Sequence, residues 1–169
     1  MFSRGLWLAI VAAIAASAAV PGSAAEPDGK ADRIVVFKAK RELDLMRGGV
    51  LLKAYPIALG GHPIGAKYRR GDRRTPEGVY VIDGRLSVTP YHLALHISYP
   101  DATDRVRARA AGVRPGGEIF IHGMPARFGR TDPVRFFRDW TNGCIAVGNR
   151  AIEEIWQAVD DGTPIEIRP

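Results

Sequence analysis

The stretch Asp139-Trp140-Thr141-Asn142-Gly143-Cys144-Ile145-Ala146-Val147 places the only cysteine of the chain where a loop meets an apolar strand. Twenty-two positions earlier, Ile119-Phe120-Ile121-His122-Gly123 is a second strand-like run, which ends in histidine and glycine. A thiol and an imidazole can form a nucleophile–base pair, because the imidazole takes the proton that the thiol must lose. The two runs therefore make Cys144 the candidate nucleophile and His122 the candidate base.

Short β-branched or alternating runs surround these two elements, separated by turns rich in Gly and Pro. In the run 91–99, for example, Leu93, Leu95 and Ile97 share one face, which predicts a strand with one face in the core. The other predicted strands are 34–38, 43–45, 50–59, 79–82, 118–122 and 165–167. These runs, with the one at Cys144, predict about eight strands.

Helical spacing is found mainly near the end of the sequence. Ile152, Ile155 and Val159 form one apolar stripe, which predicts a helix with Asn149 as its N-cap. Residues 101–111 could form a second, short helix. The prediction is a mainly β domain, a sandwich or partly closed barrel with a C-terminal helix packed on it.

The first 25 residues have the pattern of a secretory signal peptide. Arg4 precedes an apolar run of small residues, and Ser23-Ala24-Ala25 fits a cleavage site. An uncleaved anchor is the alternative, but the run is shorter than the roughly 20 residues that span a bilayer. We expect a single domain over residues 26–169, exported to the periplasm or cell envelope and not inserted in the membrane after cleavage.

Composition narrows the class of partner. The chain has 24 Lys and Arg against 18 Asp and Glu, a net charge of +6, and cleavage after Ala25 would leave +5. A moderate positive charge favours contact with anionic envelope polymers, although many solvated surfaces carry the same charge. We expect no nucleic acid partner for an exported protein, and a monomer.

A single cysteine in an oxidising compartment cannot form an internal disulfide. Cys144 is therefore a reactive thiol, a site of intermolecular bridging, or an inert buried residue, and composition does not separate these alternatives.

The sequence resembles the YkuD-type L,D-transpeptidases over essentially the whole of residues 26–169. The resemblance is carried by several elements in the family's order: the strand with Tyr55-Pro56, the turn at Gly60, Thr75-Pro76-Glu77-Gly78, His122-Gly123 and Thr141-Asn142-Gly143-Cys144-Ile145. The branch with a Trp-Thr-x-Gly-Cys-Ile-Ala motif is the most similar, and it includes members thought to hydrolyse rather than cross-link.

The resemblance implies a cysteine acyltransferase that acts on peptidoglycan stem peptides without a cofactor. The Cys144 thiolate would attack a stem-peptide carbonyl and leave a thioacyl-enzyme, which an amine or water then resolves. His122 would handle the proton and would lower the pKa of the thiol. The Gly123 carbonyl would orient the imidazole, and the backbone amides of Gly143 and Cys144 would bind the oxyanion.

Two positions depart from the commonest family pattern. Asn142 stands where a histidine usually precedes the Gly-Cys pair, and Ala146 replaces an arginine expected to help hold the substrate. Substrate-binding candidates are Thr141, Asn142, His96, Arg127 and Arg138. The segment between His122 and Cys144 carries the last two together with Arg130 and Arg135. That segment could form a basic lid over acidic carboxylates, or a solvated loop pinned by its aromatic residues.

His92 and His96 are not expected to bind a metal. They have metal spacing on a helix, but on a strand they would lie about 13 Å apart, so we expect no metal site.

Two alternative functions remain open. A non-catalytic wall-binding module would also be exported, basic and β-rich, but it would give no reason for pairing Cys144 with His122. Within the enzyme class, the sequence does not choose between transfer to an amine and hydrolysis.

Overall fold

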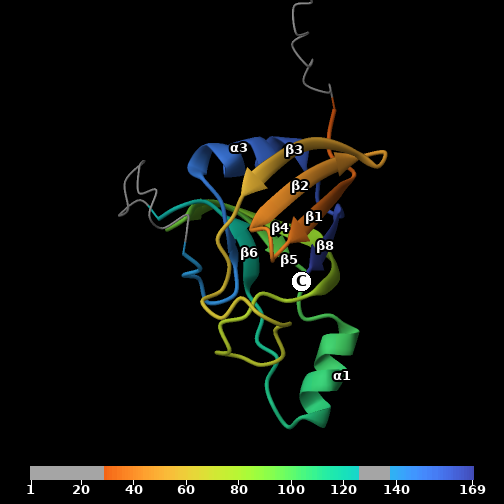
Figure 1. The fold of residues 1–169 in the computed structure, drawn as a ribbon, viewed down its shortest axis with the longest axis vertical. Coiled ribbons are helices and arrows are strands. Elements are labelled where there is room, and N and C mark those ends of the chain that lie inside the picture. The colour runs from red at the N-terminus through yellow and green to blue at the C-terminus, as the bar shows by residue number, and fades with distance from the viewer. Residues whose placement is uncertain (1–28, 126–137) are drawn as a thin grey trace, which may run out of the picture.

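The computed structural model describes residues 29–125 and 138–169 (Figure 1). The expected signal peptide and Arg127, Arg130 and Arg135 lie outside these residues. The described part contains strands β1 (Arg33–Phe37), β2 (Glu42–Arg47), β3 (Val50–Pro56), β4 (Gly78–Thr89), β5 (His92–Ile97), β6 (Ile119–His122), β7 (Ile145–Ala146) and β8 (Pro164–Arg168), and helices α1 (Ala102–Ala110) and α3 (Asn149–Ala158).

The strands form one mixed sheet in the order β3-β2-β1-β8-β4-β5-β6-β7. The β1–β8 and β6–β7 pairs are parallel, and the others are antiparallel. The ladder does not close, but isolated bridges join Ala58 to Ala146 and Gly60 to Thr141, so the segment after β3 lies along β7. The predicted mainly β fold is confirmed, with an open sheet.

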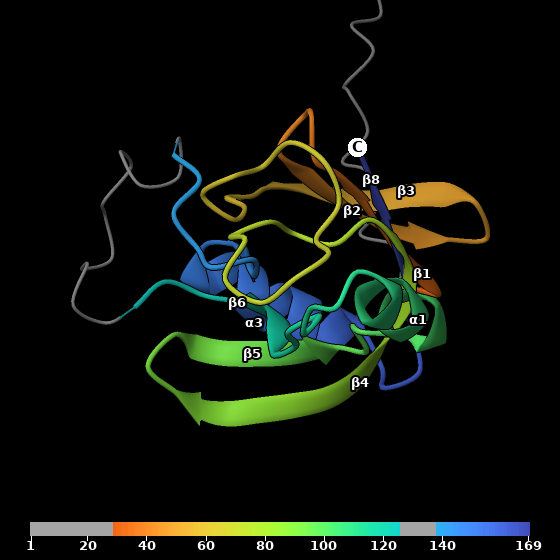
Figure 2. The ribbon, with the colours of Figure 1, turned by 90° about the horizontal axis from the view of Figure 1, so that it is seen from below.

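Strand β4 is longer than the predicted run 79–82. Its first part pairs with β8 and its second with β5, and the register shifts between Ile82 and Gly84. The strand thus passes from one half of the sheet to the other at this irregularity. The β4–β5 hairpin projects well beyond the neighbouring strands (Figure 2).

Helix α3 packs its apolar stripe against the core, with Ile152, Ile155 and Val159 at most 1% exposed. Figure 1 shows it at the opposite end of the molecule from α1. The prediction of Asn149 as N-cap is wrong, since Gly148 occupies that position without a side-chain cap. The Asn149 side chain instead accepts a hydrogen bond from the Met124 N–H at 2.7 Å, which fixes the backbone just after His122.

Helix α1 confirms the short helix predicted within 101–111. Asp101 caps it by accepting a hydrogen bond from the Asp104 N–H, and the Asp104 side chain accepts one in return from the Asp101 N–H. The Tyr80 hydroxyl donates to Asp104 at 3.0 Å and so ties the helix to β4. No helix within the described ranges is long and apolar enough to cross a bilayer.

A buried lysine anchors the loop that runs from Leu59 to Glu77. The Lys38 side chain is 2% exposed, and its ammonium donates to Glu77 Oε1 at 2.6 Å, the Gly65 carbonyl at 2.8 Å and the Thr75 carbonyl at 3.2 Å. Burial lowers the pKa of Lys38, while the Glu77 carboxylate opposes this change. The loop is therefore fixed to β1 at its far end.

A second buried lysine organises the middle of the same loop. Lys67 donates to Asp72 Oδ1 at 2.7 Å, and both residues are less than 8% exposed. Asp72 also accepts from the N–H groups of Tyr68, Arg69 and Arg74, and these hydrogen bonds hold its pKa below the ordinary value despite burial. The loop therefore has a defined shape although it contains no regular secondary structure.

Candidate active site

The sheet brings Cys144 and His122 to one cavity. In the parallel β6–β7 pair, Ile121 faces Ile145 and His122 faces Ala146. Ile121 and Ile145 are fully buried in the core. Cys144 lies directly before β7, two positions before Ala146, which is the partner of His122 in the ladder. Both side chains line one open cavity of about 560 Å³.

The His122 imidazole has one defined tautomer. Its Nδ1 lies 2.7 Å from the Gly123 carbonyl, to which Nδ1–H donates, so Nε2 is the nitrogen that can accept a proton. The ring packs against Tyr91, with centroids 4.5 Å apart, and against Trp140, at 5.8 Å, and these two rings also contact each other. A side chain at Gly123 would lie 2.7 Å from the Asn149 side-chain oxygen, so glycine is required there.

Thr141 shapes the turn before the cysteine. Its buried hydroxyl donates to the Cys144 carbonyl at 2.7 Å and accepts from the Gly143 N–H at 3.1 Å. Thr141 is among the residues that line the cavity, but its hydroxyl is occupied within the turn. The Gly143 amide is occupied as well, so the Cys144 N–H is the remaining candidate donor of the predicted pair.

The backbone of the loop after β3 packs directly beneath this turn. Gly143 has φ +133°, and a side chain there would lie 2.7 Å from the Arg74 carbonyl. At Gly60 a side chain would lie 2.2 Å from the Arg73 carbonyl and 3.1 Å from the Gly143 Cα. The Gly60 N–H donates to the Thr75 hydroxyl at 3.1 Å. The separate motif elements around Gly60, Thr75 and Gly143 thus meet in one packed layer.

Burial sets the protonation of the candidate pair. Burial lowers the pKa of His122, and it raises the pKa of Cys144 although the Phe120 backbone and Lys67 oppose this change. The sequence predicted a thiol pKa lowered by the imidazole; the structure shows the opposite direction, because loss of water disfavours both charged forms. The resting pair is therefore a neutral thiol and a neutral imidazole, and the thiol contacts the Glu118 carbonyl at 3.5 Å.

The rate of alkylation of Cys144 by iodoacetamide is expected to be low near pH 7 and to increase steeply above about pH 8.5. The reason is that only the thiolate reacts, and burial raises the pKa of this thiol above its ordinary value. Intact-mass measurement follows the reaction directly, since the chain has one cysteine. A fast rate that stays level between about pH 5 and pH 8 would contradict a neutral resting pair.

The other predicted site residues are dispersed. Asn142 is exposed and lines the cavity. His96 pairs with Asp83 at 2.5 Å and packs its ring against Phe120, which lines the cavity, but His96 itself is not among the lining residues. Arg138 is exposed and is not among the residues that line the cavity. His92 pairs with Glu153 at 2.7 Å, so the two histidines of β5 have separate acidic partners.

Sequence patterns did not predict the apolar wall of the cavity. It consists of aromatic and aliphatic side chains from the β4–β5 hairpin, from β6 and from the segment before Thr141, namely Leu86, Pro90, Tyr91, Phe120 and Trp140. Of these residues, only Trp140 could have been connected with the site from the sequence, since it lies in the same motif as Cys144. The hairpin residues could be assigned only after the length of β4 was known.

Comparison with known proteins places these features in a family context. The model of the L,D-transpeptidase catalytic domain family, YkuD, matches residues 31–167. The Escherichia coli K12 protein named "Putative L,D-transpeptidase YafK" is 34% identical over 133 residues, which cover 75% of this chain and 46% of that protein. The chain thus spans about half the length of the curated relatives it matches.

Two solved structures have the same fold. The helical cell shape determining protein Pgp2 from Campylobacter jejuni has a TM-score of 0.63 and 26% identity, over 80% of this chain and 46% of that one. Bd1075 from Bdellovibrio bacteriovorus has a TM-score of 0.57 and 25% identity, over 80% of this chain and 46% of that one.

Proposed function

This chain belongs to the YkuD family of L,D-transpeptidase catalytic domains, and from this premise we propose that it is a cysteine acyltransferase acting on peptidoglycan stem peptides in cell wall remodelling. The observation that carries the proposal is that Cys144, directly before β7, and His122, at the end of the adjacent parallel strand β6, line one open cavity. Export to the periplasm or cell envelope, and a signal peptide over residues 1–25, are part of the same proposal.

In the proposed first step, the Cys144 sulfur attacks a stem-peptide carbonyl while His122 Nε2 takes the thiol proton. The Cys144 N–H stabilises the oxyanion that forms. The carbon–nitrogen bond then breaks, and the imidazolium gives its proton to the departing amine. The product is a thioester on Cys144, and His122 is again neutral.

In the second step, an acceptor amine or water attacks the thioester carbonyl and transfers a proton to Nε2. The carbon–sulfur bond breaks, and the sulfur recovers its proton from the imidazolium. Burial lowers the pKa of His122, so the imidazole stays able to accept a proton somewhat below about pH 6.5. The same pair therefore serves transfer and hydrolysis, and the acceptor decides between them.

A carbapenem or a stem tetrapeptide is expected to add the mass of one acyl group to the protein, at Cys144. Peptide mapping locates the adduct on the only thiol of the chain. A Cys144→Ala chain that gains the same mass would place the acylation elsewhere and would remove the covalent mechanism. Absence of an adduct on the unchanged chain would favour the alternative of a wall-binding module without catalysis.

Digestion of purified sacculi is expected to separate the two reactions. New dimeric muropeptides would show transfer to an amine, as in a transpeptidase. Shortened stems, loss of cross-links or release of attached protein would show hydrolysis, as in a carboxypeptidase, endopeptidase or amidase. Hydrolysis remains the second candidate because Ala146, which faces His122 across β6 and β7, replaces the arginine usual in the family.

A further inference from the structure

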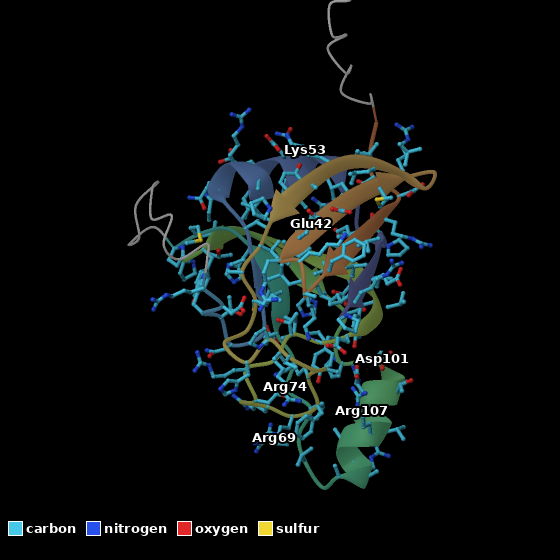
Figure 3. The ribbon with its side chains drawn as sticks, viewed as in Figure 1. Glu42, Lys53, Arg69, Arg74, Asp101 and Arg107 are labelled. Carbon is cyan, nitrogen blue, oxygen red and sulfur yellow. The ribbon has the colours of Figure 1, made fainter. Side chains whose placement is uncertain are left out.

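A second cavity, of about 840 Å³, meets the aromatic one at the sulfur. Cys144, Asn142 and Glu118 line both cavities, so a bound chain can pass from one to the other over the thiol. The remaining walls of the second cavity come from the loop between Leu59 and Glu77 and from the segment between α1 and β6. Figure 3 shows this loop, with Arg69 and Arg74 labelled, beside the part of α1 that carries Arg107.

The second cavity is strongly cationic. Lys67, Arg70, Arg73 and Arg114 line it, together with a single acidic residue, Glu118. Asp72 neutralises Lys67 behind the wall. Within residues 29–125 and 138–169, the guanidinium groups of the three arginines form no ion pair with an acidic side chain. Their charge is therefore available to a ligand.

The cationic walls are held together by backbone contacts. The Arg70 N–H donates to the Arg114 carbonyl at 2.7 Å, which joins the loop to the segment before β6. The Arg73 carbonyl accepts from the His62 N–H at 3.0 Å, and the Arg73 guanidinium packs against Gly61 so closely that a side chain there would lie 2.4 Å from it. These contacts fix the backbone of the cationic walls, and the packing on Gly61 restrains the side chain of Arg73.

We propose that this cationic cavity is a carboxylate-binding subsite, which selects acidic peptides with free carboxylates when their reacting carbonyl lies at Cys144. The inference rests on the proposed function for the position of the carbonyl. Guanidinium groups suit carboxylates because they donate paired, charge-assisted hydrogen bonds. Three arginines around one cavity favour a peptide with more than one carboxylate.

The subsite also accounts for the missing arginine at position 146. Ala146 is fully buried, and no lysine or arginine of the described part of the chain lines the aromatic cavity on the His122 side. The positive charge of this site is thus concentrated in the cavity of Arg70, Arg73 and Arg114. The acidic part of the peptide would lie there, and its apolar part against Tyr91 and Trp140.

Binding to a chain that carries Cys144→Ala tests the subsite without turnover. By titration calorimetry, the free stem tetrapeptide is expected to bind about tenfold more tightly than the same peptide with its terminal carboxyl as an amide. Adding Arg73→Gln and Arg114→Gln should weaken binding of the free acid by at least about tenfold and remove most of this preference. Arg150→Gln, which removes one positive charge from a side chain 91% exposed on α3 where the double variant removes two, should change affinity by less than about twofold.

Equal affinity for acid and amide, or unchanged affinity after loss of both arginines, would overturn the inference. The result is separate from the acylation test. Failure of the proposed function would appear as no adduct on the unchanged chain, while the binding preference could still be measured. Failure of the subsite would appear as normal acylation by the acid and the amide alike.

Discussion

Replacing Cys144 with alanine is expected to lower the turnover of a stem tetrapeptide by at least about a thousandfold, because no other thiol exists to form the thioester. His122→Gln should lower turnover by roughly a hundredfold to ten thousandfold, the usual contribution of a general base. Chromatography of the peptide products measures both effects. The thermal midpoint of Cys144→Ala should stay within a few degrees of the unchanged chain, which shows that the loss is chemical.

The double variant sharpens this prediction. Groups that act as a unit give non-additive effects, so Cys144→Ala with His122→Gln should be no slower than Cys144→Ala alone. If the two losses multiplied instead, His122 would contribute to a step that does not involve the sulfur. Retention of more than about a tenth of the activity in Cys144→Ala would eliminate the mechanism.

Replacing Lys38 with methionine is expected to lower the free energy of unfolding by about 3 kcal/mol, because Glu77 and two loop carbonyls would lose their buried donor. Chemical denaturation measures the change. Lys40→Met is the matched control: its side chain is 65% exposed, so we expect a change within about 0.5 kcal/mol.

The loop near Cys144 provides a second measure of the Lys38 effect. The segment around Thr75 should shift when its anchor is lost, and turnover should decrease even at temperatures where Lys38→Met is folded. Adding Glu77→Gln should recover part of the stability, since it removes the uncompensated carboxylate. Equal stability of Lys38→Met and Lys40→Met would show that the buried ammonium contributes nothing to the fold.

Local patterns predicted most of the sheet and the helix behind it. The β-branched run 34–38, the alternation in 165–167 and the stripe through Ile152 depend on neighbours in sequence, and they correspond to β1, β8 and α3. The extension of β4 did not follow from its residues, because Gly84 suggests a turn and only pairing with β5 keeps the segment extended. The N-cap failed because Asn149 uses its side chain for Met124.

The candidate site also has a part that the sequence predicted and a part that it did not. Cys144 and His122 lie in short motifs, and a thiol and an imidazole are residue types that indicate nucleophilic catalysis. The cationic cavity was not predictable, because Arg70, Arg73 and Arg114 come from two separate segments that a backbone hydrogen bond joins. The burial of Lys38 and Lys67 was not predictable either, because lysine is usually exposed and only the fold shows that these two are enclosed.

The central position of β8 has a consequence for how the chain reaches its native state. Its neighbours are β1 and β4, and the β1–β8 register joins Ile34 to Ile165. Pairing residues so far apart in sequence costs loop-closure entropy before any contact compensates it, and such topologies fold slowly. In the order of named strands, β8 is the only link between the meander β1–β3 and the strands β4–β7, so we expect the edges of β1 and β4 to stay open to aggregation until β8 inserts between them.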